Sequence, residues 1–225
     1  MKRPATDLSG VLFDLDGTLL DSAPDLYAAL VELSTQEGVT PPDYALVREV
    51  VSRGARAVLR RGLEGAGDDR IETLLPRFLE LYARIMGRDS HPFAGVETLL
   101  DTLESAKVPW GIVTNKAGFL AEPLLQRLAL YARAAVVVCG DTLAQRKPDP
   151  MPVLHACERA GMDPQRAVFV GDDMRDVQAG RSAGLFSVAV SWGYLDGGDP
   201  HAWEADAVVD SPRELITLLG LEARA

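Results

Sequence analysis

The chain has few cysteines and no long apolar run. Only Cys139 and Cys157 occur in its 225 residues. So few thiols exclude the disulfide framework of a small secreted domain and favour a reduced intracellular protein. No stretch approaches the roughly 18 consecutive apolar residues of a membrane span, and Met1 to Gly10 lack the apolar region of a signal peptide. We therefore expect a cytoplasmic protein without a membrane partner.

Positive charge is also scarce. The net charge is -10, and no basic stripe runs along the sequence. This balance opposes binding to nucleic acid or to an anionic membrane surface, and it suits a small anionic substrate only where the site supplies its own cations. Lysine is the rarest of the charged residues. The chain has 19 arginines but only four lysines, which are Lys2, Lys107, Lys116 and Lys147. A lysine inside a motif is therefore a candidate functional residue.

The composition is that of a globular protein, with 47% hydrophobic and 25% charged residues. Its length allows one large core and a smaller unit. Strand-like apolar runs begin with Val11 to Phe13, and from residue 94 onward they alternate with helical patterns. The later runs are Trp110 to Val113, Ala134 to Val138, Ala167 to Val170, Ser187 to Val190 and Ala207 to Val209. This alternation predicts an α/β fold with a doubly wound parallel sheet.

The segment that follows the first strand has a different pattern. Apolar residues there recur only at helical spacing, with no convincing strand. They are Leu26, Leu30 and Leu33, then Val50, Val51, Val58 and Leu59, then Leu74, Phe78, Leu81 and Ile85. We predict an α/β core formed by residues 1–20 and 93–225, and an all-helical insert at 21–92 that selects the substrate. Both connections of the insert lie near the first strand, so the insert could close over a site there.

Two carboxylates, Asp14 and Asp16, follow the first strand directly and precede Gly17. Ligands of open α/β sheets bind outside the carboxyl ends of the strands, so both side chains would reach a substrate. Like charges this close repel unless a cation or a proton lies between them, and Mg²⁺ is the natural hard cation for oxygen ligands. Gly17 lets the chain turn and lets the backbone approach a ligand.

Three later segments supply the other groups that phosphate chemistry needs. Thr114 and Asn115 end a strand and can donate hydrogen bonds to phosphoryl oxygens. Lys147 offers a compact positive charge just before a predicted helix, and Lys116 is a second candidate. Three further carboxylates follow the strand that ends at Val170, and such a cluster is costly unless it is solvated or bound to metal. They are Asp172, Asp173 and Asp176.

The ordered segments DLDGTLLD, VTNK, RKPDP and GDDMRD closely resemble the four motifs of the haloacid dehalogenase superfamily of phosphatases. The helical insert resembles the helical cap of these enzymes. The resemblance implies that Asp14 is the nucleophile and that Asp16 protonates the leaving oxygen and later activates water. It also implies that Thr114 and Lys147 hold the transferring phosphoryl group.

The metal site follows from the same resemblance. Mg²⁺ would be bound by Asp14, by the backbone carbonyl of Asp16 and by Asp172. Asp176 would order the metal shell through Lys147 or water, while Asp173 falls at a position that varies in the family. The reaction implied is hydrolysis of a phosphomonoester through an aspartyl phosphate.

The substrate would be a small phosphorylated metabolite. Several segments resemble phosphoglycolate phosphatases and also phosphatases for N-acetylmuramic acid 6-phosphate. We take 2-phosphoglycolate as the leading candidate and N-acetylmuramic acid 6-phosphate as the alternative. Because both carry a carboxylate, we expect the insert segment Ser52 to Arg56, which contains Gly54, to select the substrate through Arg53 or Arg56.

Two further functions stay open on the sequence alone. A sugar phosphomutase would share the core motifs and could hold a second phosphate with Arg53, Arg56, Arg60 and Arg61. A regulator that binds phosphate without turnover would keep the fold. The sequence also leaves open whether the protein is a monomer or a homodimer.

Overall fold

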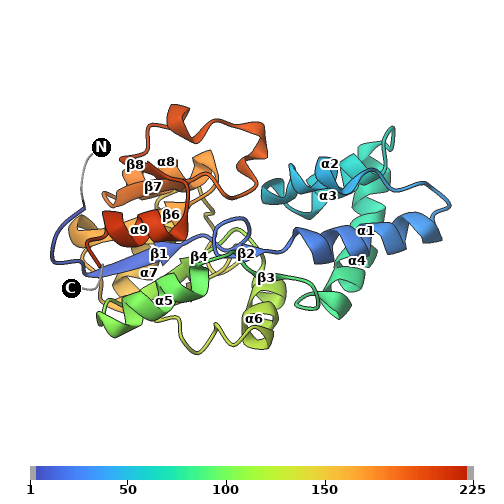
Figure 1. Cartoon of the computed structure of the whole chain (residues 1–225). Coiled ribbons are helices and arrows are strands. Elements are labelled where there is room, and N and C mark those ends of the chain that lie inside the picture. The colour runs from blue at the N-terminus through green and yellow to red at the C-terminus, as the bar shows by residue number, and fades with distance from the viewer. Residues whose placement is uncertain (1–3, 222–225) are drawn as a thin grey trace.

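A computed structural model describes residues 4–221, so Lys2 and the start of the segment Met1 to Gly10 lie outside the described residues. Its centre is a parallel sheet in the order β5-β4-β1-β6-β7-β8 (Figure 1). The strands are β1 (Gly10–Phe13), β4 (Trp110–Val113), β5 (Val137–Val138), β6 (Ala167–Gly171), β7 (Phe186–Val190) and β8 (Ala207–Val209). The order reverses beside β1, which confirms the predicted doubly wound sheet.

One predicted strand is shorter than expected. The apolar run from Ala134 to Val138 forms a strand only at β5, which is the edge of the sheet. The amide of Ala134 donates to the carbonyl of Leu130, in the turn that precedes the run, so the chain is still closing that turn where we expected a strand. Within this run only Val138 is buried and Ala135 is exposed, so apolar composition overstated both the strand and its burial at the sheet edge.

Helices cover both faces of the sheet. Val11 and Phe13 point to the face that packs against the first and last core helices, while Leu12 and Phe169 point to the other face. Because both faces are buried, β1 is apolar throughout. The core helices are α5 (Val96–Ser105), α6 (Gly118–Arg127), α7 (Met151–Ala160), α8 (Met174–Ser182) and α9 (Pro212–Leu218), with short 3-10 turns η2 (Pro164–Arg166), η3 (Leu195–Gly197) and η4 (Pro200–Ala202).

Between β1 and α5 the chain forms the helical insert, defined here as residues 22–90. Its elements are α1 (Ala23–Gln36), α2 (Tyr44–Arg48), η1 (Val51–Arg53), α3 (Ala55–Gly62) and α4 (Asp68–Ile85), which confirms the predicted helices. They pack around Leu30, Leu59 and Phe78, and Figure 1 shows them gathered beyond the carboxyl ends of the strands. The division into a catalytic core and a separate cap domain stays a prediction.

The two chain segments that join the insert to the core lie side by side. They pair as the antiparallel strands β2 (Leu20–Asp21) and β3 (His91–Pro92). The returning segment is also held by Asp25, a fully buried carboxylate of α1, which accepts hydrogen bonds from the backbone N–H groups of Gly87, Asp89 and Ser90. A buried charge that accepts several backbone N–H groups is well compensated. The entry and exit of the insert are thus fixed close to Asp14 and Asp16.

Both cysteines are free and buried. Burial raises the pKa of each thiol to about 11, which suits buried apolar residues rather than nucleophiles. Within residues 4–221, no helix combines the length and the apolar character needed to cross a membrane.

Candidate active site

Asp14, Lys147 and Asp176 form the centre of the site. Asp14 follows β1 directly, and its Oδ1 lies 2.6 Å from Lys147 Nζ. The same ammonium lies 2.7 Å from Asp176 Oδ1 in α8, and only 2% of the lysine side chain is exposed. Burial raises the pKa of both carboxyl groups, while the ammonium acts in the opposite direction. Burial would lower the pKa of Lys147, but the two carboxylates outweigh it and raise this pKa, so the lysine stays charged.

Asn115 lines the cavity, as expected, and its side chain also binds the backbone of Lys147. Its side-chain amide donates to the Lys147 carbonyl over 3.0 Å, and its Oδ1 accepts from the Lys147 N–H over 3.1 Å. The amide therefore fixes the backbone that carries the lysine. Thr114 is buried next to it, and its hydroxyl oxygen accepts from the Lys116 N–H.

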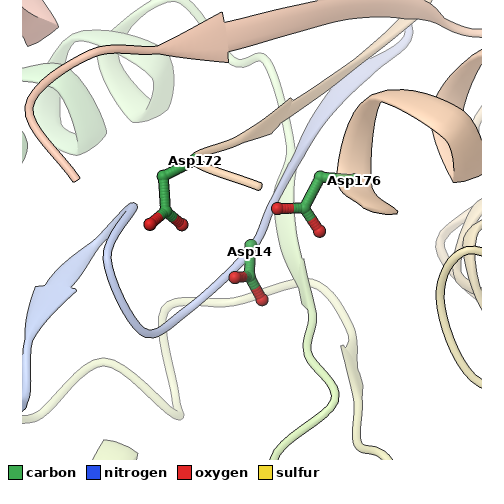
Figure 2. A group of neighbouring side chains, drawn as sticks. All are labelled: Asp14, Asp172 and Asp176. Carbon is green, nitrogen blue, oxygen red and sulfur yellow. The ribbon is translucent and has the colours of Figure 1, made fainter. Parts of the chain in front are cut away.

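Asp172 completes a cluster of acidic groups. Asp14, Asp172 and Asp176 each offer a carboxylate oxygen, all within 4.8 Å of one another, and Figure 2 shows the three side chains facing a common point. Asp172 accepts hydrogen bonds from the Thr18 hydroxyl and from the Tyr194 N–H, which are both neutral donors. Burial and the charge of Asp14 raise its pKa to about 7.

This cluster fits a hard divalent cation. Three buried carboxylates face one another, and Lys147 supplies a single positive charge to Asp14 and Asp176. Oxygen ligands with excess negative charge are the donors that Mg²⁺ prefers. Asp14, Asp172 and the backbone carbonyl of Asp16 remain our predicted ligands, with Asp176 bound to Lys147 behind them.

Gly17 is required by close packing beside this cluster. Its φ of +92° lies in the region that favours glycine, and a Cβ there would lie 2.1 Å from Asp172 Oδ2. The turn after Asp16 therefore brings the backbone against the Asp172 carboxylate, as the DG pair in the sequence suggested.

Asp173 and Asp176 also build the start of α8. The Asp173 carboxylate accepts from the Arg175 N–H, and the Asp176 carboxylate accepts from the Asp173 N–H, which makes a capping box. Burial would raise the pKa of Asp173, but hydrogen bonds from Arg175 outweigh it and lower this pKa. Asp173 therefore has a structural partner. Arg175 also donates to the Ser52 carbonyl over 2.7 Å, which ties the insert to the site.

Tyr194 is a site residue that sequence reasoning missed. Its N–H donates to Asp172, while its hydroxyl accepts from the N–H groups of Ser22 and Ala23 over 2.7 and 2.9 Å. The same hydroxyl donates to Asp21. One residue thus links the acidic cluster to the start of α1, where the insert leaves the core. No periodicity could reveal this link, because Tyr194 lies in a loop far along the chain.

Asp16 lies apart from Lys147 and binds the second lysine. Lys116 Nζ is 3.0 and 3.2 Å from the two oxygens of Asp16, and the Ser22 hydroxyl also donates to Asp16. Burial would lower the pKa of Lys116, but the charge of Asp16 outweighs it and raises this pKa. The Lys116 ammonium also lies 4.8 Å from the centre of the Tyr82 ring of α4.

A cavity of about 460 Å³ lies between the core and the insert, and it reaches all four predicted catalytic residues. Its walls include Asp14, Asp16, Thr114 and Lys147 from the core, and Ser52, Arg53, Gly54, Arg56 and Tyr82 from the insert. The sequence placed these core residues at one sheet edge, and the structure brings them together there.

The two arginines expected to bind the substrate have acidic partners. Arg53 pairs with Asp196, Arg56 pairs with Glu72, and more than half of each arginine side chain is exposed. Neither Arg60 nor Arg61 contributes to the cavity walls, and Arg60 pairs with Asp68. Of the four arginines that a phosphomutase could use for a second phosphate, only Arg53 and Arg56 therefore line the cavity.

The site thus places clustered carboxylates and a buried lysine at the carboxyl edge of a parallel sheet, in the wall of a cavity. The sequence profile described as "Haloacid dehalogenase-like hydrolase" matches residues 11–190. The chain belongs to this family.

Named relatives agree with this assignment. The chain is 45% identical over 214 residues to the N-acetylmuramic acid 6-phosphate phosphatase of Pseudomonas aeruginosa, covering 94% of this chain and 95% of the relative. It is 46% identical over 206 residues to a phosphoglycolate phosphatase of Xanthomonas campestris, covering 91% and 93%. The crystal structure of a predicted phosphoglycolate phosphatase from Haemophilus somnus shares the fold, with a TM-score of 0.84, 24% identity and coverage of 94% and 97%.

Proposed function

We propose that this enzyme is a Mg²⁺-dependent phosphatase that hydrolyses a small, carboxylate-bearing phosphomonoester through an aspartyl phosphate. The single observation that carries the proposal is the buried Asp14 carboxylate, held by Lys147 at the floor of the cavity and beside Asp172. Bound Mg²⁺ would offset the negative charge of the acidic cluster and so allow an anionic phosphate to approach it.

The chain's own residues account for the proton and the phosphoryl group. Asp14 attacks phosphorus and displaces the alkoxide oxygen, to which Asp16 gives a proton. Water then attacks the aspartyl phosphate and gives a proton to Asp16, which releases phosphate and restores both carboxyl groups. Lys147 and Thr114 hold the phosphoryl oxygens through a fixed ammonium and a buried hydroxyl.

The cavity favours a substrate of sugar size, such as N-acetylmuramic acid 6-phosphate. Its volume of about 460 Å³ is in the range of roughly 300–1,000 Å³ that holds a drug-sized ligand. Leu75, Leu79 and Phe119 add apolar walls that suit methyl and ring carbons. The printed name of the Pseudomonas aeruginosa relative points to the same substrate.

A second candidate is 2-phosphoglycolate, the leading candidate from the sequence. The printed name of the Xanthomonas campestris relative supports it. This smaller substrate would fill only the polar part of the cavity near Asp14 and Lys116. It would not contact the apolar walls. With either substrate, the partner is a small phosphorylated metabolite, and the cytoplasm is the expected place of action.

The test is phosphate release by the purified protein with Mg²⁺ from both candidates, sugar phosphates, nucleotides and a generic aryl phosphate. We expect the highest kcat/KM for a carboxylate-bearing substrate. Asp14→Asn should lower turnover of every substrate by at least about 1,000-fold, because the nucleophile is lost, with an unchanged circular dichroism spectrum. Turnover that survives in Asp14→Asn would contradict the aspartyl-phosphate mechanism and the assignment of Asp14.

A further inference from the structure

Lys116 is a buried cation in the cavity wall that the phosphoryl chemistry does not use. Only 8% of its side chain is exposed, and the ion pair it makes within residues 4–221 is with Asp16. The arginines Arg53 and Arg56 are solvated and paired with acids of their own. A buried ammonium binds an anion more strongly than an exposed guanidinium does, because water screens it less.

In this arrangement both carboxylate oxygens of Asp16 accept hydrogen bonds. Lys116 Nζ contacts both of its carboxylate oxygens, and Ser22 donates to Oδ1 as well. A residue that protonates a leaving oxygen must direct one of these oxygens, with a proton, toward the substrate. The contact with Lys116 therefore has to be exchanged before Asp16 can act.

Tyr82, beside Lys116, is a second buried group of the cavity wall that a ligand would complete. Its side chain is fully buried and lines the cavity. Within residues 4–221 its hydroxyl interacts with the Lys116 ammonium, which can only donate, and has no acceptor for its own proton. The Lys116 ammonium lies close to the same ring. A buried hydroxyl without an acceptor is unfavourable, and an acceptor atom of a ligand beside Lys116 would satisfy it.

We propose that Lys116 and Tyr82 form the subsite for the substrate carboxylate, and that a carboxylate bound there replaces Asp16 on Lys116. This inference rests on the proposed function and names the residues that select its substrate. The exchange keeps the ammonium paired with one carboxylate while it frees the Asp16 side chain to turn toward the leaving oxygen. A phosphate without a carboxylate leaves Lys116 on Asp16, so it loses turnover as well as affinity.

The experiment compares substrate pairs that differ in the group bearing the carboxylate. One pair is N-acetylmuramic acid 6-phosphate with N-acetylglucosamine 6-phosphate, and the other is 2-phosphoglycolate with 2-hydroxyethyl phosphate. For each pair the measured quantity is the ratio of the two kcat/KM values, which cancels effects common to both substrates. In Lys116→Met we expect this ratio to fall by about 100-fold, as for the loss of one partner of a buried charge pair.

Two variants complete the design. Tyr82→Phe should lower the ratio by about tenfold, as for one lost hydrogen bond to a charged group. The variant should fold normally, because the hydroxyl donates no hydrogen bond to the described part of the chain. Lys107→Met removes an exposed lysine far from the cavity walls and should leave the ratio unchanged.

The outcomes separate the two proposals. Should the unmodified enzyme show no preference for the carboxylate member of either pair, the proposed substrate class is wrong. If it does show the preference, and Lys116→Met and Tyr82→Phe both keep it, the subsite assignment is overturned while the proposed function stands. Collapse of the ratio in Arg53→Met or Arg56→Met, but in neither subsite variant, would move the carboxylate to the insert arginines. If Lys116→Met does not fold, the ratio in Tyr82→Phe decides.

Discussion

Replacing Asp172 by asparagine should stabilise the metal-free protein and remove its response to Mg²⁺. The variant keeps the shape of the side chain and can keep its hydrogen bonds, because an asparagine oxygen can accept from the Tyr194 N–H and its amide can donate to the Thr18 hydroxyl. What it removes is the negative charge that Asp172 brings into the cluster with Asp14 and Asp176.

The expected magnitude follows from the pKa of Asp172. Burial and the charge of Asp14 raise this pKa from 3.8 to about 7, and each unit corresponds to about 1.4 kcal/mol. Folded protein then holds the proton more tightly than unfolded protein, so metal-free stability falls as pH rises from about 4 to about 7. Above pH 7 the ionised carboxylate lowers the free energy of unfolding by an amount on the order of 4 kcal/mol.

The assay is thermal or urea unfolding of the EDTA-treated proteins at pH 5 and pH 8, repeated with Mg²⁺. At pH 8 without metal, Asp172→Asn should be more stable than the unmodified protein by about 2–4 kcal/mol, which is roughly 4–16 °C for a chain of this length. At pH 5 the difference should shrink, because Asp172 is then largely protonated. Mg²⁺ should stabilise the unmodified protein and not the variant.

Either of two results would refute this reasoning. One is a variant that is less stable than the unmodified protein at pH 8 without metal, which would mean that the Asp172 charge is compensated within the fold. The other is equal stabilisation of both proteins by Mg²⁺, which would place the cation away from Asp172.

Two further substitutions test the surroundings of the acidic cluster. Gly17→Ala should weaken Mg²⁺ binding at least about tenfold by calorimetry, because a Cβ would lie 2.1 Å from Asp172 Oδ2 and changes beside a metal ligand have effects of that size. Unchanged affinity would contradict the close packing. Tyr194→Phe leaves the buried N–H groups of Ser22 and Ala23 without their acceptor, so it should lower the free energy of unfolding in urea by about 1–3 kcal/mol. A neutral effect would show that water replaces the hydroxyl there.

The sequence was most informative where function depends on the ends of strands. An apolar run followed by polar residues predicts a buried parallel strand and a side chain at its carboxyl edge, and this rule located Asp14, Thr114 and Asp172 correctly at one edge. It was less informative for Asn115, whose amide holds the Lys147 backbone, because partners in a loop have no periodicity. Residues that join distant loops, such as Tyr194 and Arg175, were not identified at all.

The sequence by itself determined the sheet, the helical insert and the acidic edge, because burial of alternating apolar runs and repulsion between neighbouring carboxylates act locally along the chain. Only the tertiary structure decided how the cations are shared. Lys147 binds Asp14 and Asp176, whereas Lys116 binds Asp16 beside Tyr82. Arg53 and Arg56, which the sequence analysis expected to bind the substrate carboxylate, pair with Asp196 and Glu72. The physical reason is that ion pairing depends on distance and burial, which are set when segments far apart in the chain pack together.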